Sequence, residues 1–318
     1  MIANRAFTLV ELAIALLIVG LLLAGALIPL SSQVELRNIY ETQKTMDEIK
    51  KALLGFVLSN GRLPCPARGQ TPVATTDAVT WAPAQFAAGA EQYDTTNNRC
   101  YTVLGVLPWV SLGVSETDAW GRRFTYRVSP AFADGITAVN PNPPPANGTL
   151  ETRTNITPVS PANQSPVCSL TSAPTNSSFA LCTLGDIAVY NRNESNGSAT
   201  AQAAGLPVIV ISHGRNGYGA FKPDGQRVTG TGDLNGDGVP DQNADEAANV
   251  NGTTTLAASP VTGSSYLQYQ YFNRTPAGIA AGCSDTTAGS PLCEFDDVVI
   301  WLSPSILMSQ MVSVGKLP

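Results

Sequence analysis

The sequence predicts an α+β fold, in which one long N-terminal helix precedes a β-rich head with long loops. The first observation is an apolar run at residues 7–30 that continues into a helical stripe. The second is a set of short β-type segments farther along the chain. The third is composition, since 28 glycines and 23 prolines among 318 residues predict much loop.

The apolar run is interrupted only by Thr8 and Glu11. About 20 apolar residues span the hydrocarbon core of a bilayer as a helix. Residues 1–6 precede the run and carry Arg5, and positive charge keeps that end in the cytoplasm. A secretory signal peptide has a shorter apolar region with its cleavage site behind it. A plain membrane anchor is the other alternative, and it leaves Glu11 unexplained because a carboxylate in such a segment usually marks a function.

Residues 31–60 predict the second, amphipathic half of the same helix. Its apolar positions recur at spacings of seven, three, four and three residues, at Ile39, Met46, Ile49, Leu53 and Phe56. Asn60-Gly61 predicts the end of the helix. The helix would be about 80 Å long. We expect the stripe to pack on a head formed by residues 61–318.

The junction before the apolar run resembles a known signal. The segment Arg5-Ala6-Phe7-Thr8-Leu9-Val10-Glu11 looks like the class III signal of type IV prepilins and type II secretion pseudopilins. The resemblance implies that residues 1–6 are a leader, cut between Ala6 and Phe7, and that the new Phe7 amine is methylated. It also implies that Glu11 neutralises the Phe7 amine of a neighbouring subunit. Ala6 stands where the family usually has Gly, so we expect slower processing.

The resemblance also implies a fold, a location and partners. The fold would be pilin-like, with the long helix on an antiparallel β-sheet head. The chain would cross the bacterial inner membrane once, with its head in the periplasm, and then enter a pilus or pseudopilus, reaching the cell surface in the case of a pilus. Its partners would be prepilin peptidase, other pilin or pseudopilin subunits and the inner-membrane assembly platform. The mature chain of 312 residues is large for a repeated subunit, which favours a minor one.

A second class of function stays open beside the filament subunit. The chain would then be a membrane-anchored periplasmic binding or adhesive protein that uses the signal only for insertion. Glu11 discriminates between the two, because it is useful mainly for packing against like helices.

Four segments of the head predict β-strands, at residues 101–106, 123–128, 206–212 and 297–302. The last two are continuous apolar runs, which are typical of buried central strands. Residues 304–314 predict a C-terminal helix. Residues 129–180 are rich in Pro, Asn, Ser and Thr and predict an insertion, and residues 253–265 also predict a loop.

Asp118-Ala119-Trp120-Gly121, with Tyr126 five residues on, resembles a stretch of major type II secretion pseudopilins. In that family the stretch opens the β-sheet against which the long helix packs. We therefore expect a turn leading into a strand, with Trp120 and Tyr126 in the core.

Six cysteines and a predicted head outside the cytoplasm favour disulfides. Sequence alone allows 15 connectivities. Zinc is the alternative, but no C-x-x-C pair is present. Pairing of nearest neighbours predicts three bridges, Cys65–Cys100, Cys168–Cys182 and Cys283–Cys293.

Residues 233–246 predict a calcium loop. The interval between Arg227 and Arg274 contains five acidic residues and no Lys or Arg, and so carries −5 of the net charge of −6. Its start fits the pattern D-x-[DN]-x-[DN]-G. We expect side-chain or carbonyl oxygens from six residues to bind the ion: Asp233, Asn235, Asp237, Val239, Asp241 and Asp245. Glu246 could replace Asp245 as the closing ligand. No helical pattern flanks the loop. The simpler explanation of the acidic residues is a solvated turn that binds no ion.

Other chemistries find little support. The acidic balance argues against nucleic-acid binding, which requires clustered Lys and Arg. Ser212-His213 suggests a hydrolase with Asp186 or Asp224, but the G-x-S-x-G pattern is absent. Adjacent residues on a strand also point to opposite faces. We expect a structural histidine and no enzyme activity.

Overall fold

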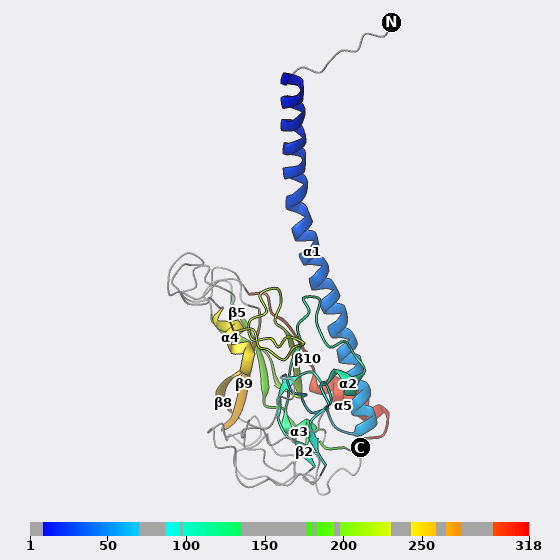
Figure 1. Ribbon diagram of the computed structural model, residues 1–318. Helices are drawn as coiled ribbons and strands as arrows, with labels where there is room; N and C mark the ends of the chain where they lie inside the picture. The colour runs from blue at the N-terminus through cyan, green and yellow to red at the C-terminus, as the bar shows by residue number, and fades with distance from the viewer. Residues whose placement is uncertain are drawn as a thin grey trace.

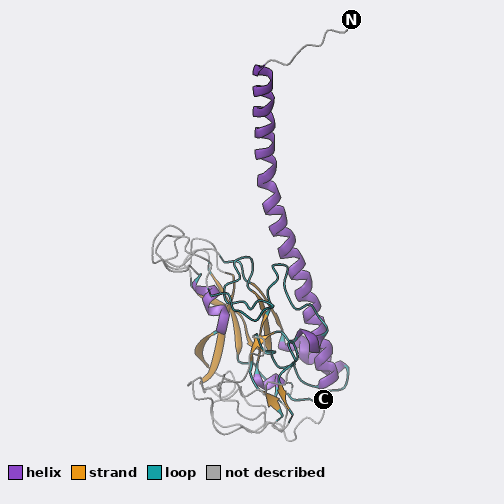
Figure 2. Ribbon diagram, in the orientation of Figure 1, coloured by secondary structure: helices purple, strands orange, loops and turns teal. Residues whose placement is uncertain are grey.

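The computed structural model describes residues 9–69, 87–95, 98–134, 177–179, 181, 183–193, 198–229, 243–258, 265–274 and 295–317. Within this part, two helices and two sheets form three layers (Figure 1). The helices α1 and α5 pack on one face of a first sheet, and a second sheet packs on the other face. The colouring by secondary structure shows the strands gathered in the head, beside the C-terminal part of the long helix (Figure 2).

Helix α1 (Leu9–Asn60) confirms the predicted long helix. The buried apolar residues of its described part are Met46, Ile49, Leu53 and Val57, so Val57 takes the fully buried position that the stripe assigned to the half-buried Phe56. The helix ends as expected, because Gly61 adopts φ 71° and its N–H donates to the Val57 carbonyl at 2.8 Å. The C-terminal helix α5 (Pro304–Ser313) packs beside α1.

The first sheet contains the four predicted strands, each somewhat shorter than expected. Its order is β10-β7-β4-β3, and every neighbouring pair is antiparallel. Its strands are β3 (Leu104–Val106), β4 (Thr125–Val128), β7 (Val208–Ser212) and β10 (Val298–Leu302).

Strand β7 shows why its sequence is a continuous apolar run. Val208 and Val210 belong to the core shared with α1 and α5, whereas Ile209 and Ile211 belong to the core shared with the second sheet. Successive side chains of a strand point to opposite faces, so a strand between two packed layers needs apolar residues at every position.

The second sheet was not predicted. Its order is β6-β5-β9-β8, with a parallel pair β5–β9 between two antiparallel ones, so the β structure is not wholly antiparallel. Strand β8 also contradicts the loop expected from residue 253 onward. The strands are β5 (Ile187–Arg192), β6 (Ala199–Leu206), β8 (Thr253–Ala258) and β9 (Ser265–Arg274).

Short elements complete the described head. They are the ribbon of β1 (Tyr93–Asp94) and β2 (Arg99–Cys100) and the helices α2 (Trp109–Leu112), α3 (Pro130–Ala133) and α4 (Ala244–Asn251). Helix α3 occupies the start of the predicted insertion, whose residues 135–176 lie outside the described part of the chain.

The turn at Asp118 joins the helix layer to the first sheet. One carboxylate oxygen of Asp118 accepts hydrogen bonds from the N–H groups of Trp120 and Arg122, and the other accepts from the Ser212 hydroxyl of β7 at 2.7 Å. The hydroxyl of Thr42 on α1 accepts from the N–H of Ala119 at 3.2 Å. The expected turn and the buried Tyr126 are confirmed, but Trp120 is only half-buried.

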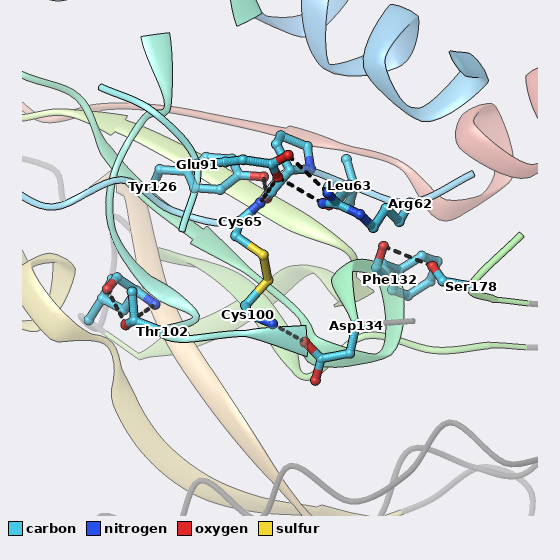
Figure 3. Close-up of a disulfide and its surroundings, with 12 residues drawn as sticks. Arg62, Leu63, Cys65, Glu91, Cys100, Thr102, Tyr126, Phe132, Asp134 and Ser178 are labelled. Carbon is cyan, nitrogen blue, oxygen red and sulfur yellow. Dashed lines mark hydrogen bonds and ion pairs between the residues drawn. A yellow bond between two sulfur atoms is a disulfide. The ribbon is translucent and has the colours of Figure 1, made fainter. Parts of the chain in front are cut away.

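The disulfide Cys65–Cys100 fixes the chain just beyond α1, and it confirms the first of the three expected pairs (Figure 3). Glu91 pairs with both terminal nitrogens of Arg62, at 2.8 and 2.9 Å, and also accepts from the N–H of Cys65. Asp134 accepts from the N–H of Cys100. The other four cysteines, Cys168, Cys182, Cys283 and Cys293, lie outside the described residues.

Candidate functional site

The N-terminal half of α1 is the largest exposed apolar surface of the described chain. Residues 9–20 are all exposed, and this half extends away from the head (Figure 1). Its exposed large apolar side chains are Leu9, Val10, Leu12, Ile14, Leu16, Leu17, Ile18 and Val19. A helix that is apolar on all sides is normally surrounded by lipid or by other helices, and a large exposed apolar patch marks an interaction surface.

Glu11 lies in the first turn of α1 and is exposed among these apolar side chains. A carboxylate at a helix N-terminus is favoured by the helix dipole. In an apolar environment it also requires a cationic partner. The predicted cleavage site at Ala6 and Phe7 lies outside the described residues. Among the residues that are described, no helix meets the length and hydropathy of a membrane span.

The predicted calcium loop is only partly visible in the structure. Asp233, Asn235, Asp237, Val239 and Asp241 lie outside the described residues. Asp245 lies in the first turn of α4 and forms a two-point ion pair with Arg192 of β5, with both N–O distances 2.6 Å. Helix α4 begins at this point, although the sequence showed no helical pattern here. The side chain of Asn243 caps the helix and accepts hydrogen bonds from the N–H groups of Asp245 and Glu246. The calcium loop itself stays a prediction.

A cluster of three carboxylates lies beside α4: Glu246, Asp296 and Asp297, whose oxygens lie within 4.8 Å of one another. Glu246 is 1% exposed and Asp297 6%. Two negative charges at this distance repel by about 3–4 kcal/mol at an effective dielectric constant of 20. Burial, and then the neighbouring Asp297 and Asp296, raise the pKa of Glu246 from 4.5 to about 9.

Neutral groups hold the cluster in place. Asn216 donates from its side chain to Glu246 at 2.9 Å and from its backbone to Asp296 at 2.8 Å. Glu246 also accepts from the N–H of Asp296, and Asn249 of α4 donates to Asp297. The sequence predicts Glu246 only as an alternative calcium ligand, and its local patterns do not indicate the two aspartates. The Asp-Asp pair directly before the apolar run of β10 was the available signal.

Ser212 and His213 do not form a catalytic pair. Ser212 donates to Asp118, whereas Nε2 of His213 is hydrogen-bonded to the Thr125 hydroxyl at 2.8 Å and its Nδ1 lies 3.4 Å from Asp297. Ser212 and His213 are fully buried.

The two aspartates weighed for a triad lie elsewhere. Asp186 pairs with Arg127, and Asp224 accepts from the N–H of Gln226. The geometry fits a structural histidine.

Comparison with known proteins gives one match. Residues 1–27 match the family model described as the prokaryotic N-terminal methylation motif. No curated protein and no solved structure shows a significant similarity to the chain. The chain therefore carries, at its N-terminus, the prepilin-type signal of type IV pilins and pseudopilins.

Proposed function

We propose that the chain is a minor subunit of a type IV pilus or of a type II secretion pseudopilus. Prepilin peptidase removes the leader, residues 7–30 anchor the subunit in the inner membrane, and the same segment later packs in the filament core. The observation that carries the proposal is the continuity of the methylation motif with helix α1, which is 52 residues long and whose first residues, 9–20, are all exposed.

The two halves of α1 support this division of labour. Residues 9–20 leave their apolar side chains exposed, whereas the buried residues Met46, Ile49, Leu53 and Val57 belong to the core of the head. A head fixed to one half of a helix leaves the other half for lipid first and for neighbouring subunits afterwards. In that apolar bundle the Glu11 carboxylate forms an ion pair with the methylated Phe7 amine of the next subunit. The pair offsets the desolvation cost of burying both charges.

The test replaces Glu11 by alanine in the full chain. We expect normal leader removal and membrane insertion, with the subunit lost from the sheared filament fraction, as followed by immunoblotting of membrane and filament fractions. Glu48→Ala is the matched control, because Glu48 is an exposed glutamate on the head-bearing half of α1. If the Glu11→Ala chain enters filaments as well as the wild type does, the result would instead support the alternative that the chain is a membrane-anchored binding or adhesive protein.

A further inference from the structure

The buried carboxylate cluster joins two parts of the fold that are distant in sequence. Glu246 comes from the first turn of α4, and Asp296 and Asp297 directly precede β10 of the first sheet. Asn216 follows β7 and hydrogen-bonds to both Glu246 and Asp296. A ligand held at this point would connect the helix beside the second sheet to the end of the first sheet.

The carboxylates of Glu246 and Asp297 contact no lysine or arginine among the described residues. Among the described residues, Glu246 receives hydrogen bonds only from the side-chain amide of Asn216 and the backbone N–H of Asp296. The Asp297 side chain has no exposed surface, and its Oδ1 accepts no hydrogen bond within the described part of the chain. Nδ1 of His213 lies 3.4 Å from that oxygen, and it also makes no hydrogen bond within the described residues. A buried carboxylate oxygen in this position calls for a cation or a proton.

We propose that Glu246, Asp296 and Asp297 bind one divalent cation of the calcium type. Carboxylate oxygens are the ligands that calcium prefers, and oxygens bound at 2.3–2.6 Å lie up to about 5 Å apart across the ion. The observed spread of at most 4.8 Å lies within that limit. The site differs from the predicted loop, because Asp245 is held by Arg192 and Asp296 and Asp297 come from another part of the chain.

The first experiment measures calcium binding to the full chain in detergent micelles, after EDTA treatment and removal of the chelator. Calorimetric titration with CaCl₂ and melting curves in CaCl₂ or EDTA would be recorded for the wild type, Glu246→Gln and Asp297→Asn. We expect calcium to raise the wild-type Tm, and each variant to bind the ion at least about tenfold more weakly and to lose most of that rise. Glu48→Gln, which makes the same chemical change on the exposed face of α1, should behave as wild type.

The second measurement locates the ion without any variant. Hydrogen exchange of the wild-type chain should slow on calcium addition in peptides covering residues 295–302 as well as 243–251. Two results would overturn the proposal. A wild-type chain with the same Tm and exchange in calcium and EDTA would mean that the carboxylates share a proton only. Calcium binding that survives in Glu246→Gln and Asp297→Asn but is lost in Asp237→Asn would assign the ion to the predicted loop instead.

Discussion

Asp118 is the single side chain on which the junction of helix and sheet depends. Its two oxygens accept three hydrogen bonds, two from its own turn and one from Ser212 of β7. The carboxyl is 6% exposed, and burial raises the pKa of Asp118 above 3.8 although the three hydrogen bonds lower it. The folded protein therefore retains the Asp118 proton at a pH where the unfolded chain has released it.

The replacement Asp118→Ala should lower the free energy of unfolding by about 2–3 kcal/mol, since buried donors lose their acceptor. Asp118→Asn keeps an acceptor for the turn and should cost about 1 kcal/mol or less at low pH. As pH rises above 3.8 the wild type loses stability, by up to about 1.4 kcal/mol per pH unit, until the raised pKa is passed. Asp118→Asn should not show this loss, so urea unfolding from pH 3 to 6 should favour the variant increasingly. If the free energies of unfolding of the two proteins change in parallel with pH, the raised pKa of Asp118 would be contradicted.

At the scale of elements, local patterns were sufficient for two of the three layers of the fold. Helix α1, helix α5 and the first sheet follow from apolar periodicity, a glycine end signal and continuous apolar runs. The second sheet depends on partners far along the chain, and five of the eight residues of β6 are Ala or Gly, which are depleted in strands. The alternation of Gln268, Tyr269, Gln270 and Tyr271 was the signal that could have indicated β9.

The same limit applies to the candidate site. The calcium loop was found because its ligands follow a fixed local spacing. The carboxylate cluster was missed because Glu246 and Asp297, which are distant in sequence, are brought together only by tertiary contacts such as the hydrogen bond from Asn249 of α4 to Asp297. Spacing along the chain carries no information on a pair formed by tertiary contacts.

The disulfide Cys65–Cys100 closes a loop across 35 residues at the base of α1. A loop of this length corresponds to about 4 kcal/mol in the chain-entropy model of the unfolded state. We expect the double variant Cys65→Ala/Cys100→Ala to lose stability of this order in urea unfolding. Its α1 should stay attached, because the core that contains Met46, Ile49 and Leu53 also includes buried side chains of the first sheet and of α5 besides the two cysteines. Equal midpoints for variant and wild type would show that the unfolded chain gains no freedom from the loss of the bridge.

For the molecule as a whole, folding and assembly occupy different stretches of one helix. The fully buried apolar side chains of α1 begin at Met46, whereas residues 9–20 are all exposed. A chain lacking residues 1–32 should therefore fold with an unchanged Tm and stay monomeric in buffer without detergent, since it retains all the α1 residues that the structure describes as buried and loses the exposed apolar residues 9–20. Deletion of residues 1–50 is the matched control, and it should unfold because Met46 and Ile49 leave large cavities in the core. Melting curves and light scattering on both chains give the comparison. If the shorter deletion already unfolds or aggregates the head, the N-terminal half of α1 takes part in folding, and the division between the two halves is wrong.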